Sequence, residues 1–313
     1  MALTVRELAV PAGSQRTSGW SALAVAMRPQ QWTKNLVVFA APVFSMSYSV
    51  RVGVFALLAF FAFCAISSAT YLVNDLVDVR ADRLHPVKRN RPIAAGILSA
   101  RVAVLSAVTL AAASLWLSAL IDAGLVLAVT IYGLLQLAYN LWLKREPIVD
   151  VLCVSAGFVT RAVGGAAAAS VLVSTWFLLC VALLATFLAL EKRRAELRAL
   201  GDAAPTRAVL REYSMPILGR IEDVVVAAGL IAYSLWAAQR TGKHWMLVTV
   251  PMVAYVVFRY QMLAEKGGGE EPEALLLKNP QIVIAILLWL ALCIAILLLQ
   301  GYGAPWDACS QRC

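Results

Sequence analysis

Four polar side chains with oxygen atoms stand close together where a long apolar stretch of the sequence ends. Asn74, Asp75, Asp78 and Asp82 occupy relative positions 0, 1, 4 and 8. On one helix, this spacing places all four side chains within an arc of about 100°. Because like charges at this spacing destabilise a helix, something must compensate them. A hard divalent cation that takes oxygen ligands and also binds substrate phosphates, such as Mg²⁺, would do so. We therefore predict these four residues as metal ligands.

A simpler interpretation is that an apolar helix ends in water with a few acidic residues. Two observations weigh against it. Aspartates contribute little to the orientation of a membrane protein, so they are not needed for topology. A basic run also follows the acidic residues at once and contains Arg80, Arg83, Lys88, Arg89 and Arg91. Carboxylates, a metal ion and cations together suit a polyphosphate ligand.

Three further polar clusters are expected on the same side of the membrane. They contain Arg28 and Lys34; Lys144, Asp150 and Arg161; and Lys192, Arg193 and Glu196. Arg161 lies well inside an apolar segment, where a guanidinium costs several kcal/mol unless it is paired or lines a wet cavity. Snorkelling to the interface is the alternative for Arg161. Lys192 and Glu196 are four residues apart and can pair, but anchoring the positive-inside topology is an alternative role for the basic residues of this segment.

The elements that must position these side chains are membrane-spanning helices. The chain is 61% hydrophobic and only 14% charged, and its mean hydropathy is +0.78. Apolar stretches of about 20 residues cross a hydrocarbon core as helices. The sequence predicts an all-α integral membrane protein with about nine spans: 32–50, 53–77, 101–120, 123–143, 149–170, 173–195, 217–238, 244–262 and 280–300.

The net charge of +9 is distributed unevenly between the loops. Lys and Arg concentrate after the second, fourth, sixth and eighth predicted spans, which the positive-inside rule assigns to the cytoplasm. We therefore expect a multi-pass protein of the cell membrane, with the N-terminus and the polar cavity on the cytoplasmic side and the C-terminus outside. We expect a flexible leader at 1–25, one catalytic domain at 26–303 and a short outer tail at 304–313, where Cys309 and Cys313 either pair or stay free.

At the residues described above, the sequence resembles the UbiA superfamily of intramembrane prenyltransferases. The first aspartate-rich motif of that superfamily, N-D-x-x-D-x-x-x-D, is matched in full by residues 74–82. Within the superfamily the chain resembles the branch that transfers phosphoribose in cell-wall arabinan synthesis. The features that carry this are "RPQQWTKN" (28–35), the basic continuation to Gly96, "PIVDV" (147–151), "GFVTR" (157–161) and "KRRAEL" (192–197).

The resemblance implies a UbiA-type helical bundle and a Mg²⁺-dependent reaction. Phosphoribosyl pyrophosphate (PRPP) would be the donor, and the monophosphate of a polyprenyl lipid, decaprenyl phosphate, would be the nucleophile. Asp75, Asp78, Asp82 and Lys34 are then expected to take part in catalysis. The expected substrate-binding residues are Asn74, Arg28, Arg83, Lys88, Arg91, Tyr139, Lys144, Asp150, Arg161, Lys192 and Arg193.

The charges of these side chains indicate a more detailed role for each of them. Mg²⁺ would hold the pyrophosphate, with Arg83, Lys88 and Arg91 gripping it or capping its exit. Lys144, Lys192 and Arg193 are candidates for the ribose 5-phosphate, and Arg28 and Lys34 for the lipid phosphate. Asp150 would orient Lys144 or contact ribose hydroxyls, and Arg161 would pair with an acid or a phosphate. The lipid chain would lie in a groove lined by residues such as Phe39, Phe44, Trp142 and Phe158, which are equally ordinary packing residues.

One departure and two alternatives bear on this interpretation. The second aspartate-rich motif of ordinary UbiA enzymes is replaced by "EKRRAEL" (191–197). This replacement favours a pocket rich in basic residues. It argues against a conventional aromatic prenyltransferase, which is the first alternative. A transporter or flippase is the second, but its polar residues would be spread along a pathway. The small residues in "AVGGAAAAS" (162–170) fit either internal packing or a homo-oligomer contact. We expect no nucleic-acid partner.

Overall fold

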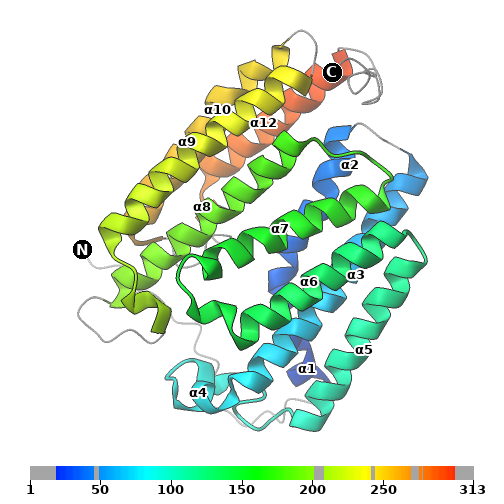
Figure 1. The fold of residues 1–313 in the computed structure, drawn as a ribbon, viewed down its shortest axis with the longest axis vertical. Helices are drawn as coiled ribbons and strands as arrows, with labels where there is room; N and C mark the ends of the chain where they lie inside the picture. Colours follow the sequence, from blue (N-terminus) through cyan, green and yellow to red (C-terminus); the bar gives the residue numbers. More distant parts are fainter. Residues whose placement is uncertain are drawn as a thin grey trace.

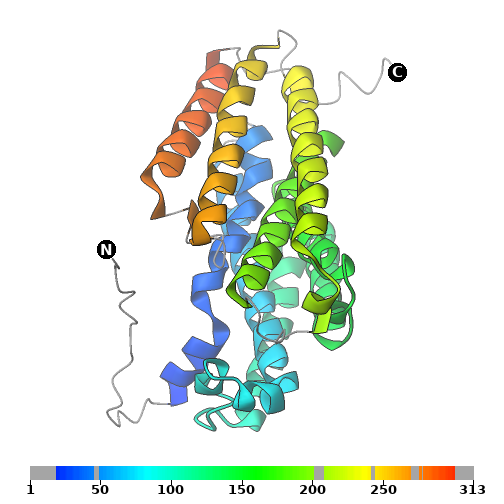
Figure 2. The ribbon, with the colours of Figure 1, turned by 90° about the vertical axis from the view of Figure 1, so that its left-hand side faces the viewer.

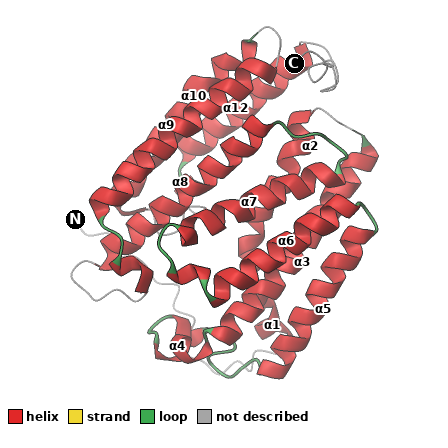
Figure 3. Ribbon diagram, in the orientation of Figure 1, coloured by secondary structure: helices red, strands yellow, loops and turns green. Residues whose placement is uncertain are grey.

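The computed structural model describes residues 19–45, 49–200, 208–240, 244–268, 275–276 and 278–299. Within these ranges the chain is built of helices and connecting loops, and no strand is present (Figures 1 and 3). The all-α prediction is therefore confirmed. The predicted outer tail, with Cys309 and Cys313, and most of the predicted leader lie outside the described residues.

Eight helical segments are long and apolar enough to cross a membrane. They are α3 (Val50–Val77), α5 (Ala100–Ala119), α6 (Ala123–Leu141), α7 (Val149–Ala168), α8 (Thr175–Leu200), α9 (Met215–Arg240), the segment of η5 (Trp245–Thr249), α10 (Val250–Leu263) and η6 (Ala264–Gly268), and α12 (Pro280–Leu299). Each corresponds to one predicted span, from the second to the ninth.

The first predicted span, 32–50, does not form one continuous helix. The chain instead makes a short α1 (Gly19–Met27), a 3₁₀ helix η1 (Pro29–Phe39) and a short α2 (Ala40–Ser45). Arg28 joins the first two in a left-handed backbone conformation with φ 54°. Helix α1 begins inside the range that was expected to be a flexible leader, and its buried Ala22 and Ala26 show that it packs as part of the bundle.

Sequential helices mostly pack side by side (Figure 1). Helix α3 contacts α5, α6 and α7, and α8 contacts both α7 and α9 and so joins the two halves of the bundle. Helix η1 packs on both α3 and α7, and Figure 2 shows it in blue. Many apolar side chains face outward, such as Leu105, Val108 and Trp116 on α5. A bilayer would cover this outer apolar surface.

The starts of three spanning helices are capped by side chains, which fixes where the loops end. Ser49 accepts a hydrogen bond from Val52 N before α3, and Ser99 accepts one from Val102 N before α5. Asp122 accepts from Gly124 N and Leu125 N at the start of α6. Such caps satisfy backbone N–H groups that would otherwise lack partners at a helix start.

The small residues of 162–170 serve internal packing. Helix η1 crosses α7 at Gly165, where an added Cβ atom would lie 2.0 Å from the backbone oxygen of Val38. At the neighbouring Gly164 a Cβ would meet the ring of Phe63 at 2.6 Å. The missing side chains therefore let η1 and α3 lie directly against α7, which brings the polar residues of these three elements together.

Gly165→Ala should destabilise the protein by at least about 1–3 kcal/mol, because the new methyl group meets backbone that cannot move as a side chain can. The matched control is Gly219→Ala in α9, where nothing lies within 4 Å of the added atom. That change should be neutral or stabilise the helix by up to about 1 kcal/mol. Thermal unfolding in detergent compares the two variants. Equal melting temperatures for both would contradict the close crossing of η1 and α7.

Candidate functional site

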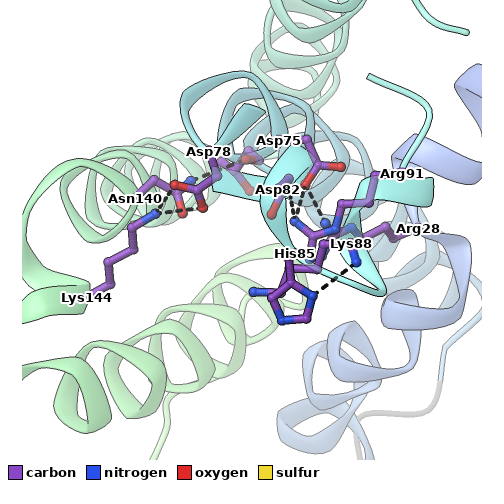
Figure 4. Close-up of polar contacts among 10 residues, drawn as sticks. Arg28, Asp75, Asp78, Asp82, His85, Lys88, Arg91, Asn140 and Lys144 are labelled. Carbon is purple, nitrogen blue, oxygen red and sulfur yellow. Dashed lines mark hydrogen bonds and ion pairs between the residues drawn. The ribbon is translucent and has the colours of Figure 1, made fainter. Parts of the chain in front are cut away.

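The aspartate-rich motif bends at its middle residue. Helix α3 ends at Val77, Asp78 lies at the junction, and a short α4 (Val79–Leu84) follows. The prediction that Asn74, Asp75, Asp78 and Asp82 share one face of a single straight helix is therefore wrong in detail. Figure 4 shows that Asp75 and Asp82 point to one side and Asp78 to the other.

Asp75 and Asp82 converge on the same cation. Both are almost fully buried, and both accept hydrogen bonds from Arg91 Nη1, at 3.1 Å and 2.7 Å. Asp75 also pairs with Arg28 at 2.5 Å. Low-dielectric surroundings make such pairing necessary, because an unpaired buried carboxylate is costly. The sequence brought Asp75, Asp82 and Arg91 together correctly, but it did not predict that Arg28 joins them.

Asp78 belongs to a second ion pair. Its two carboxylate oxygens accept from Lys144 Nζ at 2.7 and 2.8 Å. Lys144 lies in a one-turn 3₁₀ helix η3 (Leu143–Arg145) after α6, so this contact ties the end of α3 to the loop between α6 and α7. Asn140 of α6 lies beside it and donates to Thr70 O (Figure 4). The expected pairing of Asp150 with Lys144 is not what the structure shows.

Asp150 instead pairs with Arg193. It is fully buried at the start of α7, and its Oδ2 accepts from Arg193 Nε of α8 at 2.7 Å. Arg193 also donates to Glu196 at 2.7 Å and lies 3.5 Å from the hydroxyl oxygen of Tyr139. Predicted residues from α6, α7 and α8 thus meet in one network around a buried guanidinium.

Tyr213 completes this network and was not predicted from the sequence. Its hydroxyl donates to Asp150 Oδ1 at 2.7 Å and accepts from Ile148 N at 2.6 Å. Ile148 has φ 66°, a left-handed conformation that is unusual for a β-branched residue and that the Tyr213 contact supports. Burial, followed by the contact with the Asp150 carboxylate, raises the pKa of Tyr213, so its hydroxyl stays protonated and remains a donor.

The remaining predicted residues lie around these two networks. Lys34 is partly buried on η1, Asn74 partly buried on α3, and Lys192 partly buried on α8. Asn74 O accepts from Asp78 N at 2.9 Å. Arg83 is exposed and donates to Ala94 O at 3.2 Å, and Lys88 donates its backbone N–H to His85 Nδ1. Arg83 and Lys88 therefore lie at the outer edge of the acidic motif rather than at its centre.

Arg161 lies deeper, in a cluster with neutral partners. It donates from Nε to Asn35 Oδ1, from Nη1 to Gly157 O and from Nη2 to the hydroxyl of Tyr132, at 2.6, 2.8 and 2.8 Å. Its guanidinium carbon lies 4.4 Å from the centre of the Tyr132 ring. The interpretation of Arg161 as a snorkelling residue is therefore wrong, because the side chain is only 4% exposed and is held inside the bundle.

A separate cluster occupies the position of the missing second motif. Arg194 on α8 pairs with Glu191 at 2.6 Å, Glu222 at 2.5 Å and Glu265 at 3.0 Å. Gln261 donates to the other oxygen of Glu222 at 2.6 Å. Glu191 and Glu222 are fully buried. The cluster thus joins α8, α9, α10 and η6, and Glu191 acts here as a partner of Arg194.

An apolar cavity of about 450 Å³ opens between α8, α9, α10, α12 and the N-terminal segment. Phe44 and Phe158 line it, as expected for a lipid-chain site. Phe39 packs on Phe60 at 5.5 Å between ring centres and Trp142 is 66% exposed, and neither lines this cavity.

The carboxylates of the aspartate-rich motif are the candidate ligands for Mg²⁺. Among the residues that the structure describes, no group of three or more acidic, His or Cys side chains is assembled as a metal site. Two of the three motif aspartates do converge: because Asp75 and Asp82 both bond to one nitrogen of Arg91, those oxygens lie within about 6 Å of each other. Hard carboxylate oxygens around a shared cation suit Mg²⁺. Here Arg91 and Arg28 hold these oxygens, so Asp75 and Asp82 would supply ligands to a divalent ion in place of those contacts, while Asp78 is turned toward Lys144.

A family model described as the UbiA prenyltransferase family matches residues 35–279. The chain belongs to this family. A solved UbiA homolog from Archaeoglobus fulgidus, bound to GPP and Mg²⁺, has the same fold, with a TM-score of 0.68 at 20% identity over 89% of this chain and 99% of that one.

Two curated relatives narrow the comparison within the family. The decaprenyl-phosphate phosphoribosyltransferase of Mycolicibacterium smegmatis is 37% identical over 287 residues, which cover 86% of this chain and 90% of the relative. The protein of the same name from Mycobacterium tuberculosis is 36% identical over 85% of this chain and 91% of the relative. The resemblance seen in the sequence motifs thus extends over most of the chain.

Arg194→Met should destabilise the protein by about 3–5 kcal/mol, because it leaves Glu191 and Glu222 buried without their shared cation. Arg211→Met is the control, since Arg211 is exposed and a surface change should stay within about 0.5 kcal/mol. Thermal unfolding in detergent measures both. A melting temperature for Arg194→Met equal to that of the control would mean that the cluster does not hold α8, α9 and α10 together.

Proposed function

We propose that this protein transfers the 5-phosphoribosyl group of PRPP to the phosphate of a polyprenyl lipid, decaprenyl phosphate, and releases pyrophosphate. The product, decaprenyl-phosphoryl-5-phosphoribose, serves cell-wall arabinan synthesis. The observation that carries the proposal is the presence of two separate charged networks, Asp75–Asp82–Arg91–Arg28 and Asp150–Arg193–Tyr213. The Asp78–Lys144 pair ties the end of α3 to the loop that leads to Asp150. The curated relatives, which match over most of their length, support it.

The first network suits the leaving group. Asp75 and Asp82, with Asp78 and Asn74 nearby, would hold Mg²⁺, which when bound offsets the negative charge that develops on pyrophosphate. Arg91 is within reach because it already contacts both carboxylates. Arg83 and Lys88 lie at the outer edge, where they can cap the exit of the product.

The second network suits the 5-phosphate of the donor. Arg193 is held by Asp150 and Glu196, and Lys144 and Lys192 lie on the neighbouring η3 and α8. PRPP carries a diphosphate and a monophosphate at opposite ends of ribose, so it needs two separate basic sites. A prenyl diphosphate with a neutral aromatic acceptor needs only one, which is why the arrangement favours the phosphoribosyl reaction over the conventional one.

The reaction requires little acid–base catalysis. An anionic oxygen of the lipid phosphate attacks C1 of ribose and forms the new C–O bond, while the bond from C1 to the pyrophosphate oxygen breaks and pyrophosphate leaves with the electron pair. No proton is transferred in this step. The residues of the two networks then act mainly by positioning and by stabilising charge, and a histidine base is not needed.

The proposal also assigns the orientation of the protein in the membrane. The loops after α3, α6 and α8 carry both networks and are rich in Lys and Arg, so we assign them to the cytoplasmic side of the cell membrane. The charged donor would then enter from the cytosol. The lipid acceptor would come from within the bilayer.

Membranes that contain the protein should transfer label from PRPP to decaprenyl phosphate in the presence of Mg²⁺. Asp75→Asn should reduce this rate by about a hundredfold or more, because it removes a carboxylate that would hold the Mg²⁺ whose charge offsets that of the leaving group. Asp122→Asn, at the capped start of α6, is the matched control and should stay near the wild-type rate, since Asn also caps helices. Transfer of a prenyl group to an aromatic acid instead, or equal rates for both variants, would reject the proposal.

Tyr213→Phe should raise the KM for PRPP about tenfold, because Asp150 loses a hydrogen bond and no longer fixes Arg193. The effect on kcat at saturating PRPP should be smaller. Tyr255→Phe on α10, whose side chain is 48% exposed, is the matched control and should change neither constant. A uniform loss of kcat for Tyr213→Phe with unchanged KM would place Tyr213 outside the donor site.

A further inference from the structure

Arg161 is a buried cation whose hydrogen-bond partners are all neutral. Its three contacts are an amide oxygen, a backbone carbonyl and a tyrosine hydroxyl. Among the described residues, no aspartate or glutamate forms an ion pair with it. The aromatic rings of Tyr132 and Phe158, at 4.4 and 5.4 Å, add some cation–π attraction. They do not neutralise the charge.

The surroundings hold this guanidinium rigidly in place. Asn35 is fully buried, and Tyr132 and Arg161 are 2% and 4% exposed. The contacts reach α3 twice, because Asn35 Nδ2 donates to Cys64 Sγ at 3.2 Å and the Tyr132 hydroxyl bonds to Ser67 Oγ at 3.2 Å. A fixed, buried positive charge without a counter-ion within the described chain favours the binding of an anion.

The apolar cavity adjoins this charge. Phe158, which lies against the Arg161 guanidinium, also lines the cavity of about 450 Å³. On η1, Val37 lines the cavity two residues after Asn35. A ligand with one anionic group and an apolar chain would therefore place the anion at Arg161 and the start of the chain in the cavity. A cavity of this size holds only the first few units of a long polyprenyl chain.

The distance to the acidic motif suits such a ligand. On α3, Ser67 lies at the level of Arg161 and precedes Asp75 by eight residues, which is about 12 Å along the helix. Arg28, just before η1, contacts Asp75, and Asn35 on η1 contacts Arg161; seven residues at the 3₁₀ rise span about 14 Å. The two elements give similar separations, which leave room for one ribosyl group between a diphosphate at Asp75 and a phosphate at Arg161.

The geometry points to Arg161 as the binding site for the phosphate of the polyprenyl acceptor, with the first part of its chain in the cavity lined by Phe158. This inference rests on the proposed function for the identity of the acceptor. It also revises the sequence-based assignment of the lipid phosphate to Arg28 and Lys34, because Arg28 is held by Asp75 at 2.5 Å.

The test is a binding measurement without PRPP or Mg²⁺. Protein in nanodiscs of neutral lipid is titrated with geranylgeranyl phosphate and with geranylgeraniol, and binding is followed by tryptophan fluorescence, since Trp236 and Trp289 line the cavity. The wild type should bind the phosphate at least about tenfold more tightly than the alcohol, because a charge-assisted contact to a buried guanidinium distinguishes them. Equal affinities in the wild type would overturn the inference.

Two variants locate the site. Arg161→Gln should bind phosphate and alcohol equally, with the affinity for the alcohol unchanged. Arg51→Gln is the matched control, because Arg51 also lies over an aromatic ring, that of Phe55, but at the other end of α3; it should keep the preference for the phosphate. A preserved preference in Arg161→Gln would refute the assignment.

If Arg161→Gln does not fold, Gly229→Leu keeps the inference open to refutation. Gly229 lines the cavity, and a larger side chain there should weaken both ligands by about tenfold or more. Unchanged binding would exclude the cavity. The experiment also separates this inference from the proposed function. If phosphoribosyl transfer is absent but the preference for the phosphate still depends on Arg161, PRPP is rejected as the donor and the lipid site is retained.

Discussion

The pairing of charges inside a membrane-embedded bundle is the constraint on which the rest of this structure depends. Each ionised group that leaves water must find a partner or accept a large free-energy cost. The chain meets this requirement with a small number of shared cations: Arg91 serves two aspartates, Arg193 serves Asp150 and Glu196, and Arg194 serves three glutamates. These shared arginines bring helices together that are distant in sequence, so one set of interactions both assembles the bundle and concentrates positive charge near its loops.

The same constraint separates the clusters by role. In the network of Arg194, three acids meet one central cation, and α8, α9, α10 and η6 all contribute, which is what a structural brace requires. In the network of Arg91, two cations meet two aspartates, and both arginines stay partly exposed. Arg193 is paired with two acids, and the basic Lys192 precedes it in the chain. Arg161 is the extreme case, since its partners are dipoles rather than acids. The balance of charge thus sets the Arg194 brace apart from the surroundings of Arg91 and Arg161.

Much of this was accessible from the sequence. Apolar length gave eight spans to within a few residues, because a helix that crosses a bilayer must satisfy its own backbone hydrogen bonds. The motif spacing also placed Asp75 and Asp82 together. The break of the helix at Asp78 was not predicted, since nothing in "LVDVRAD" (76–82) is a strong helix breaker and the bend follows from the tertiary pair with Lys144. Tyr213 was missed for a related reason: a tyrosine in a loop gives no local signal, and its importance comes from contacts 63 and 65 residues away. The first span was misjudged because apolar content does not reveal whether backbone winds as α or as 3₁₀.

The 3₁₀ winding of η1 affects the distance that this segment covers. A 3₁₀ run of eleven residues is unusually long, and it rises about 2.0 Å per residue where an α-helix rises about 1.5 Å. The seven steps from Arg28 to Asn35 would cover only about 10 Å as an α-helix, somewhat less than the roughly 12 Å that the neighbouring stretch of α3 covers. The thinner, stretched coil of η1 therefore acts as a spacer of fixed length, gripped at one end by Asp75 and at the other by Arg161. The rise per residue of the η1 backbone sets the distance between the two ends of the site, and no side chain has to adjust for it.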